Sequence, residues 1–546
     1  MKPRHPYVTA VWWVALLAVV PSMYAQEAAA PRHTGVPQDW SEGHIVFSRD
    51  TLALHPDLMD REPRVLHQVM QRWQPPNSGV FQGSQPLPTA AGKSGSHRDW
   101  SVSPGGRLAA FRYAAKFSFD PGALPDCTND YVVFGLASSG VTGGRANLVA
   151  FNNLYVNDAG NGLCPGKAPN VLFAYNITTA ATTGRIVTSP ILSLDGTKIG
   201  FVESIPGTPP TAVFHVLTWT AGHGTIGNAA APPISMVSVP FSLAAYDSAS
   251  SPWIDYSADI VYVGSDNGLV YKITGVFHGT PALSGAPTWP VQAGIFHLTS
   301  PVLDSVRGEL MVGSASLFQI DTATGFVSTL AVGGGPSSGI VAPPIVDVTN
   351  GTTFVVSAND GTSAVLVEFD TAGAFEMARG RIGLGAHGGT AFNIHSPAVN
   401  NLYFNNPSIG GEIRVCGTGA ADTTPTLYAF GFAGALMNRI PLTSQQILAS
   451  TAARCAGFTE FFNPNVGGGT DYFFFGLTKD CTGLGTGGCV AEFTDADPSA
   501  IVTTPVSGGP SGIIVDNYSS AAEASSIYLT AEGINTAYKF TQAGLK

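Results

Sequence analysis

The sequence predicts an all-β protein, and three observations support that prediction. The chain holds 64 glycines and 39 prolines in 546 residues. This composition suits short strands joined by tight turns and disfavours helices, in which glycine costs about 1 kcal/mol and proline about 3. From about residue 99 onward, short apolar runs rich in Val, Ile, Phe and Tyr are broken by Gly, Asn, Asp and Pro. Finally, one short element recurs along this part of the chain, which predicts repeated units of antiparallel strands.

The recurring element consists of a small or polar residue, a proline and two or three mostly apolar residues. It occurs five times, at Thr188–Leu192, Ser250–Ile254, Thr299–Leu303, Ala342–Val346 and His395–Val399. A second strand ending in small residues usually follows, and then a third. Degenerate copies start near Ala114, Thr459 and Gly512, so the chain contains eight starts.

Eight starts predict a β-propeller of eight blades, each with four antiparallel strands. The intervals between starts run from about 43 to 75 residues, which fits such blades with loops of variable length. Seven blades is the alternative if the copy near Ala114 is not a true blade. The last copy supplies too few strands before the chain ends, so we expect its fourth strand to come from near His44–Ser48 or Trp100–Ser103. Closing the ring in this way removes exposed sheet edges.

Two of these repeats resemble known propeller repeats. Val261–Ile273 resembles the repeat of the PQQ-like, or quinoprotein-like, β-propeller superfamily, and Ser193–Val202 resembles the WD40-like repeat of exported bacterial propellers. The similarity covers roughly residues 110–546. His97–Asp130 also resembles a group of exported bacterial proteins without assigned activity. The resemblance implies the propeller fold but no single function, because the superfamily includes dehydrogenases, assembly factors and binding scaffolds.

The N-terminus has the three parts of a signal peptide. A basic start at Met1–Arg4 precedes an apolar run from Val8 to Val20, and Ala25 is a small residue at the expected cut. The run is too short to cross a bilayer as a helix, which needs about 20 residues. We therefore predict a signal peptide over residues 1–25 and a secreted or periplasmic protein without a transmembrane segment. A retained, uncleaved anchor is the alternative.

Residues 26–98 differ in pattern from the repeats and are predicted to be an appendage and linker to a propeller of residues 99–546. A helix is expected over residues 60–74, with Asp60 as its cap and Pro63 in its first turn. Its apolar residues recur at helical spacing: Val65, Leu66, Val69, Met70 and Trp73. Asn77–His97 reads as a linker. We expect the appendage to pack on the side or bottom of the propeller.

The charge of the chain argues against nucleic acid as a partner. Without Lys2 and Arg4, 24 basic and 37 acidic side chains remain, a formal charge of −13. No cluster of Lys or Arg offsets the repulsion that a polyanion would meet.

The six cysteines predict disulfides, because their number is even and the chain is exported. Fifteen connectivities are possible. The preferred one joins neighbours: Cys127 with Cys164, Cys416 with Cys455, and Cys481 with Cys489. The absence of Cys-x-x-Cys-His excludes covalent c-type haem, and the cysteine spacing disfavours zinc.

The other short motifs favour structural readings, so no cofactor and no metal site are predicted. Asp266-Asn267-Gly268 and Asn359-Asp360-Gly361 lie between expected strands, which favours type I′ hairpin turns over calcium loops. Asp321–Gly325 matches the first half of the docking element of quinoprotein dehydrogenases, but no tryptophan follows and no two cysteines are adjacent. Gly380–Gly385 lacks the strand-to-helix context of a nucleotide loop. No Gly-x-Ser-x-Gly elbow supports an esterase-type triad.

The remaining candidates lie at one mouth of the axial channel, because the first strand of each propeller blade lines the axis. His297, His395 and Glu460 fall beside or within repeat starts. A histidine with a pKa near 6.5 and a carboxylate could bind a metal, a sugar or a peptide end, or act as acid and base. If neutral histidine binds the ligand, affinity should weaken as the pH falls through about 6.5. The alternative is that the three side chains bond only to channel water or backbone.

The leading functional hypothesis is an exported, non-catalytic scaffold that binds a protein, peptide or glycan. Few charged residues lie on the expected inner strands, which favours binding over acid–base chemistry. The alternative is an enzyme, a lyase, glycosidase or oxidoreductase, with its site at the mouth of the channel. A structural subunit of a surface layer or filament is a third reading.

Overall fold

The structure is a computed structural model in which residues 33–546 form one compact unit. The described residues are 35–38, 44–58, 62–72, 95–120, 124–179, 183–242, 247–285, 288–332, 339–387, 394–447, 453–464, 466–481, 487–517, 519, 521, 523–531, 534–542 and 545. The expected signal peptide, the cap Asp60, Trp73 and most of the expected linker lie outside them. None of the described helices is long and apolar enough to cross a membrane.

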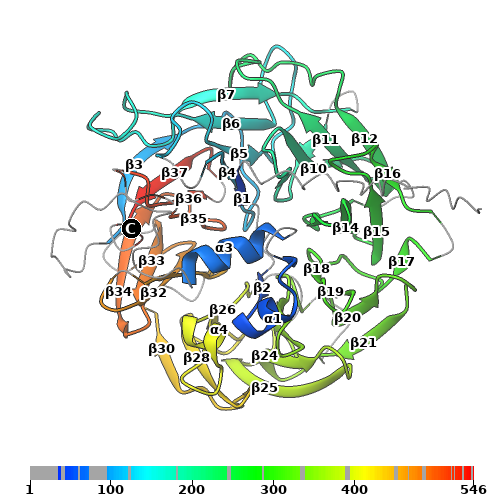
Figure 1. Cartoon of the computed structure of the whole chain (residues 1–546), viewed down its shortest axis with the longest axis vertical. Helices are drawn as coiled ribbons and strands as arrows, with labels where there is room; N and C mark the ends of the chain where they lie inside the picture. The colour runs from blue at the N-terminus through cyan, green and yellow to red at the C-terminus, as the bar shows by residue number, and fades with distance from the viewer. Residues whose placement is uncertain are drawn as a thin grey trace, which may run out of the picture. The chain divides into compact units, whose positions relative to one another are not determined.

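The described strands form eight sheets arranged around an axis, which confirms the predicted eight-bladed propeller (Figure 1). Each expected start leads into the first strand that its repeat contributes to one blade. The first four blades contain β4 (Ala115–Ser118), β5 (Tyr131–Gly135), β6 (Leu148–Asn152) and β7 (Asn170–Tyr175); β8 (Arg185–Ile186), β9 (Ile191–Leu192), β10 (Lys198–Ile205), β11 (Thr211–Thr218) and β12 (Val237–Ser242); β13 (Trp253–Asp255), β14 (Ile260–Gly264), β15 (Leu269–Thr274), β16 (Ala282–Leu283) and β17 (Val291–Gln292); and β18 (Val302–Asp304), β19 (Glu309–Gly313), β20 (Ser316–Asp321) and β21 (Val327–Ala331).

The other four blades complete the circuit. They contain β22 (Ile345–Asp347), β23 (Thr352–Ser357), β24 (Ser363–Asp370) and β25 (Phe375–Leu384); β26 (Ala398–Val399), β27 (Glu412–Gly417), β28 (Thr426–Ala433), β29 (Leu436–Met437) and β30 (Thr443–Gln446); β31 (Thr459–Asn463), β32 (Thr470–Leu477), β33 (Gly488–Thr494) and β34 (Asp497–Val506); and β35 (Ile514–Asp516), β36 (Ser526–Thr530) and β37 (Ala537–Thr541). Blades are numbered 1–8 in this order.

Blade 8 is completed by a strand from the N-terminal side of the propeller. β3 (His97–Val102) pairs antiparallel with β37, as in one of the two closures that the sequence predicts. The other candidate segment, β2 (His44–Val46), instead pairs parallel with β22 of blade 5. β1 (Val36–Gln38) pairs antiparallel with β4 of blade 1. The N-terminal segment therefore contributes a strand to three blades.

The repeated serine before proline has a structural role that explains the motif. The backbone N–H of Tyr113 donates to Oγ of Ser189, that of Ser189 to Oγ of Ser251, and that of Ser251 to Oγ of Ser300, at 2.9, 2.9 and 2.8 Å. These bonds link blades 1 to 4 in series near the axis. Because all three serines are buried, each bond satisfies a backbone group that would otherwise be costly to bury. Apolar clusters fill the spaces between adjacent blades.

The predicted helix is present as α3 (Pro63–Arg72), but its expected position is wrong. It lies over the centre of the ring and contacts blades 3 and 7, and does not pack on the outer side of the propeller (Figure 1). Arg64, at its first turn, lies 3.9 Å from the ring centroid of Trp253 in blade 3, and Arg72, in its last turn, bonds to Glu460 in blade 7. The physical reason is that Arg64 and Arg72 of α3 are buried and find partners on the inner strands of blades 3 and 7.

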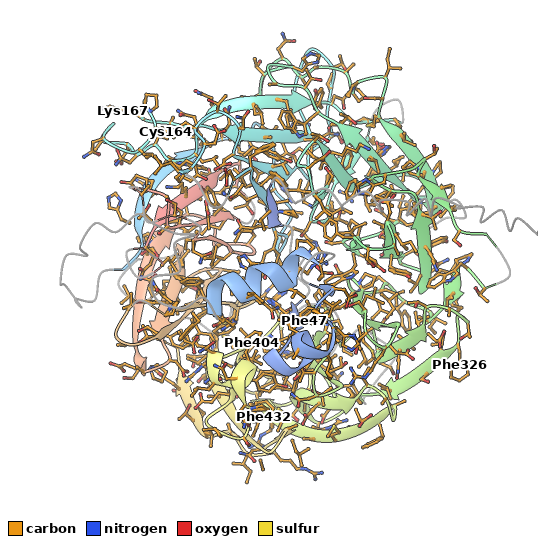
Figure 2. The ribbon with its side chains drawn as sticks, viewed as in Figure 1. Phe47, Cys164, Lys167, Phe326, Phe404 and Phe432 are labelled. Carbon is orange, nitrogen blue, oxygen red and sulfur yellow. A yellow bond between two sulfur atoms is a disulfide. The ribbon has the colours of Figure 1, made fainter. Side chains whose placement is uncertain are left out.

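Two further short helices were not predicted from the sequence. α1 (Arg49–Leu54) follows β2 and is capped by Ser48, whose Oγ accepts the N–H of Thr51. α4 (Asn401–Asn405) follows β26 and is capped in the same way by Asn400. Phe47, before α1, is fully buried, and Phe404 of α4 lies near it in the view of Figure 2.

The disulfide prediction is confirmed, whereas the turn type is corrected. Cys127–Cys164 lies within blade 1, Cys416–Cys455 joins blades 6 and 7, and Cys481–Cys489 lies within blade 7. The Asp266–Gly268 and Asn359–Gly361 segments are hairpin turns, but only their glycines have positive φ, +80° and +101°. Type I′ requires two such residues, so these turns are not of that type.

Candidate functional site

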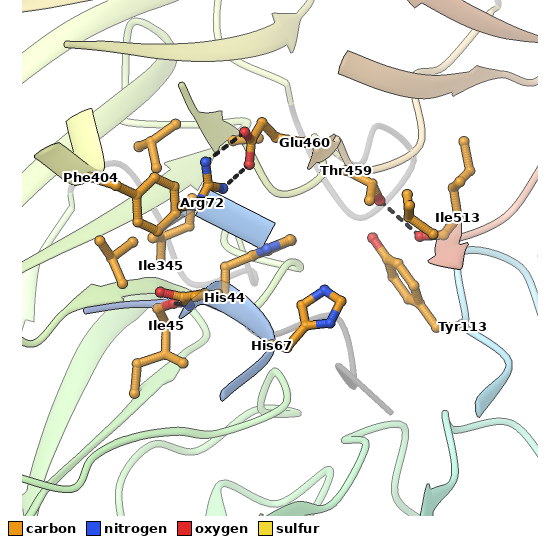
Figure 3. Close-up of a pocket in the computed structure, with 15 residues that line it drawn as sticks. His44, Ile45, His67, Arg72, Tyr113, Ile345, Phe404, Thr459, Glu460 and Ile513 are labelled. Carbon is orange, nitrogen blue, oxygen red and sulfur yellow. Dashed lines mark hydrogen bonds and ion pairs between the residues drawn. The ribbon is translucent and has the colours of Figure 1, made fainter. Parts of the chain in front are cut away.

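The contact between α3 and blades 6 and 7 occupies the region where the sequence predicts a channel (Figure 3). Nη1 of Arg72 donates to Oε1 of Glu460 at 2.9 Å and to Oδ1 of Asn401 at 3.1 Å, and Nη2 donates to Oε2 of Glu460. The guanidinium lies 3.6 Å from the ring centroid of Phe404. The side chains of Arg72 and Glu460 are only 2% and 5% exposed. Glu460 is therefore held by the helix and is not open to a ligand from solvent.

A second carboxyl group lies beside this ion pair. Asp471 on β32 accepts the backbone N–H of Asn401 at 2.8 Å. Burial raises the pKa of Asp471 to about 9, and the neighbouring carboxyl of Glu460 raises it further than Arg72 lowers it. Asp471 is consequently protonated at neutral pH, which avoids two adjacent buried anions.

Between α3 and the inner strands a cavity of about 90 Å³ remains. His44, His67, Tyr113 and Glu460 are among the residues that line it (Figure 3). Burial lowers the pKa of His44 to about 4 and that of His67, with a smaller effect of Arg72, to about 3. The volume of the cavity is well below the range of about 300–1,000 Å³ that is usual for ligand pockets.

His395 and His297 belong to a different polar cluster. The ring of His395 stacks on Phe111 with centroids 3.9 Å apart, and its Nε2 is buried without a hydrogen-bond partner among the described residues. Burial, followed by the charges of Arg112 and Arg454, lowers the pKa of His395 to about 3. The expectation that this histidine charges near pH 6.5 is therefore wrong.

Arg112 connects the two histidines electrostatically. It acts on His395 and also on Asp266, which in turn interacts with His297. Burial raises the pKa of Asp266, as does the charge of Asp247, while His297 lowers it. Arg112 thus links His395 to His297 electrostatically through Asp266, and Glu460 lies in the separate contact with α3.

A larger hollow of about 670 Å³ lies between blades 5 and 6, and we call it the rim groove. Its volume falls within the range of about 300–1,000 Å³ that is usual for ligand pockets. Blade 5 contributes residues of β24 and β25 and of the turn before β24, and blade 6 contributes residues of β28 and β30 and of their flanking loops. The groove residues used below are Arg379, Arg381, Leu384, Asp360, Asp422, Tyr428, Arg439 and Ile440.

The acidic residues of the rim groove already have partners. Oδ2 of Asp360 accepts Nη1 of Arg379 at 3.1 Å, and Oδ2 of Asp422 accepts the N–H groups of Leu384 and Gly419 at 3.0 and 2.6 Å. Arg381 and Arg439 are exposed, and neither has a hydrogen bond or ion pair among the described residues. Two guanidinium groups therefore face solvent in the groove of a chain whose net charge is −11.

Sequence reasoning missed the groove because it treated Gly380–Gly385 only as a possible nucleotide loop. Arg379 and Arg381 are two residues apart in β25, so both side chains project from the same face of the strand. The spacing of Arg379 and Arg381 was the one signal in the sequence that could have indicated the groove. Nothing in the sequence indicated that Arg439, from the loop after β29, would lie on the same groove.

Comparisons with known proteins give no family. No protein-family model matches the chain, and no curated protein matches it. Among solved structures, BamB from Moraxella catarrhalis is similar with 12% identity and a TM-score of 0.42, over 82% of this chain and 98% of that one. The computationally designed Ika8 protein is similar with 12% identity and a TM-score of 0.44, over 82% and 100%. At these scores, neither name transfers to this chain.

Proposed function

We propose that the protein is a secreted or periplasmic scaffold that binds an acidic segment of a protein partner in the rim groove. The single observation that carries the proposal is the pair of partnerless guanidinium groups of Arg381 and Arg439. The three disulfides support an oxidising compartment. The proposed role needs no cofactor and is compatible with membership of the PQQ-like superfamily, as the repeats suggest.

Charge complementarity favours an anionic ligand. Arginine presents several donors in a planar fork that matches a carboxylate, and charge-assisted bonds of this kind are stronger than neutral ones. Around the groove, the negative net charge of the chain repels acidic molecules, so positive potential confined to this place would direct them there. Arg379 is shared by Asp360 and Glu376, and Asp422 accepts only backbone N–H groups among the described residues. The positive potential of the groove therefore comes from Arg381 and Arg439.

Apolar side chains beside the arginines favour a protein segment over a glycan. Ile440 is 79% exposed, Leu384 46%, and the adjacent Leu442 56%. Arginine is enriched at protein interfaces, and covering exposed aliphatic side chains with apolar surface is favourable, whereas a sugar has little apolar surface to cover such groups. Tyr428 adds a half-buried aromatic ring to the groove. The preferred segment therefore carries carboxylates next to aliphatic residues.

A second candidate site is the polar cluster of His297 and His395. The observation that favours it is the buried, partnerless Nε2 of His395, since a buried polar atom without a partner is costly unless a ligand or water satisfies it. Glu460 does not join it, because Arg72 occupies its carboxylate.

The proposal is tested with synthetic peptides. We expect pools that alternate Glu with Leu to bind the exported protein, and the same pools with Gln in place of Glu to bind at least about tenfold more weakly, as expected for the loss of charge-assisted bonds. The double variant Arg381→Glu/Arg439→Glu should lose this preference. Arg98→Glu is the matched control, because Arg98 is also exposed on a strand and has no partner among the described residues.

Each alternative has its own outcome. Equal binding of the acidic and amide pools would refute the proposal. Binding of polygalacturonate but not of the peptides, lost in the double variant, would replace the peptide with an acidic glycan. Loss of binding in the His395→Ala variant alone would instead support the axial cluster.

A further inference from the structure

We infer that blade 2 carries a catalytic site for acyl-ester hydrolysis, with Ser238 as nucleophile, His215 as base and Glu203 as the residue that orients the base. Oγ of Ser238 lies 2.9 Å from Nδ1 of His215, and Nε2 of His215 lies 2.9 Å from Oε2 of Glu203. This is the hydrogen-bond order of a serine hydrolase triad, which is recognised by geometry and roles and not by sequence position. The site is separate from the rim groove and goes beyond the proposed binding function.

The three residues meet because they lie on three consecutive strands. Glu203 is on β10, His215 on β11 and Ser238 on β12, which are neighbours in one antiparallel sheet (Figure 1). His215 is directly opposite Ser238 in the register, and Glu203 is two residues from Phe201, the partner of His215 on β10. Side chains two residues apart on a strand share a face, so all three project from the same side of blade 2.

Glu203 is held firmly in its orienting position. Its carboxylate accepts Oγ1–H of Thr179 at 2.6 Å and the backbone N–H of Thr179 at 3.1 Å. Glu203 and His215 are both 0% exposed. A buried carboxylate with several donors has one preferred orientation, so the imidazole that donates to it is fixed as well.

These contacts determine the tautomer of His215, and that tautomer allows the imidazole to act as base for Ser238. A carboxylate oxygen can only accept, so with Glu203 ionised Nε2 of His215 carries the hydrogen and donates a hydrogen bond to Glu203. Nδ1 is then the lone-pair nitrogen, and the hydroxyl of Ser238 donates to it. The two ring nitrogens have exchanged places relative to the usual serine protease arrangement, but their roles as base and donor are the same.

Ser238 is the exposed member of the three, and its own N–H faces outward. β12 is the outermost strand of blade 2 among the described residues. Pro240 lies opposite Val213 and has no N–H, so its nitrogen faces away from β11. Backbone groups alternate along a strand, so the N–H of Ser238, two residues earlier, also points to the open edge. A serine's own N–H is one of the two oxyanion-hole donors in serine proteases.

The reaction that fits is hydrolysis of a small acyl ester. Oγ of Ser238 attacks the carbonyl carbon while its proton moves to Nδ1 of His215, and the N–H of Ser238 donates to the oxygen on which negative charge develops. The alkoxide leaves with the proton from His215, which gives an alcohol and an acyl-serine. Water, losing a proton to His215, then attacks the acyl-serine; the carboxylic acid leaves and Ser238 is regenerated.

The test is covalent labelling of the exported wild-type protein, which needs no variant. A fluorophosphonate probe should label Ser238, as located by peptide mapping, and p-nitrophenyl acetate should be hydrolysed with an initial burst of p-nitrophenol. Ser238→Ala should abolish labelling and the burst. Ser328→Ala is the matched control, because Ser328 lies on β21, the outermost strand of blade 4, opposite Gln319 instead of a histidine.

The orienting role of Glu203 is tested by a kinetic split. Glu203→Gln keeps the size of the side chain and should lower kcat for p-nitrophenyl acetate by roughly 10²–10⁴-fold while KM stays within about twofold. A merely structural role would change the thermal midpoint without this split. No labelling of Ser238 in the wild type, or equal hydrolysis by the wild type and Ser238→Ala, would overturn the inference while leaving the peptide-binding proposal untouched.

Discussion

The contact between α3 and blades 6 and 7 holds an arginine near carboxyl groups, and so does the rim groove. The arginines of the two regions differ in their exposure and in whether they are paired. Arg72 is 2% exposed at its side chain and makes two bonds to Glu460. Arg381 and Arg439 are exposed and have no partner among the described residues. The difference teaches that the chain pairs its buried cations internally and presents unpaired cations where a partner can reach them.

The same contrast explains why the contact between Arg72 and Glu460 does not look like a binding site. A charge buried near the axis must be matched inside the protein, because the cost of leaving it unpaired is several kcal/mol. α3 brings Arg72 to Glu460, and the resulting contact fills the space that a ligand would use. The groove arginines remain hydrated and carry no such cost.

The largest expected effect is that of Arg72→Met. Methionine keeps much of the volume but leaves the buried carboxylate of Glu460 without its cation, so the free energy of unfolding should fall by about 3–5 kcal/mol. Urea denaturation measures it. Adding Glu460→Gln to the variant should recover a large part of the loss, and Arg98→Met should change the free energy of unfolding by less than about 0.5 kcal/mol. A small loss in Arg72→Met would mean that α3 does not need this contact.

The next effect has the opposite sign. Asp471→Asn should raise the free energy of unfolding at pH 7 by about 2 kcal/mol, because the folded protein keeps Asp471 protonated whereas the unfolded chain ionises it. The amide can still accept the N–H of Asn401 and donate towards Glu460.

The pH dependence of the free energy of unfolding tests whether Asp471→Asn stabilises the protein for the stated reason. The folded pKa of Asp471, about 9, lies above the unfolded value of 3.8, so its contribution to stability is complete below pH 3.8 and declines as the pH rises towards 9. The advantage of Asp471→Asn over the wild type should therefore grow between pH 4 and pH 8 in denaturation curves. An advantage that is constant with pH would contradict the raised pKa.

The blades, their number and the disulfides could be predicted because their signals are local. Each of the five clear starts contains a proline, and Oγ of Ser189, Ser251 and Ser300 accepts a backbone N–H from the preceding blade each time. Ring closure also followed from the sequence, because blade 8 lacked a strand. Neighbouring cysteines paired as expected since the repeats keep them in one blade or in adjacent blades.

The complete candidate sites could not be predicted, because they depend on strand register and on contacts between elements that the sequence pattern does not specify. The apolar spacing of α3 predicts a helix but not where it packs, and its partner Glu460 lies 388 residues along the chain. Ser238, His215 and Glu203 meet only if three strands have the observed register, and a slip of one residue would place a side chain on the other face.

The smallest expected effect concerns the rim groove. It tests whether the exposed arginines, unlike Arg72, contribute little to stability. Arg381→Ala and Arg439→Ala should each change the free energy of unfolding by less than about 0.5 kcal/mol, because exposed side chains without partners contribute little to stability. Urea denaturation beside Arg72→Met gives the contrast within one protein. A loss above about 1 kcal/mol in either groove variant would show that its guanidinium is needed by the fold itself. Such a residue would stabilise the fold as Arg72 does, and the argument that it is available to bind a partner would fail.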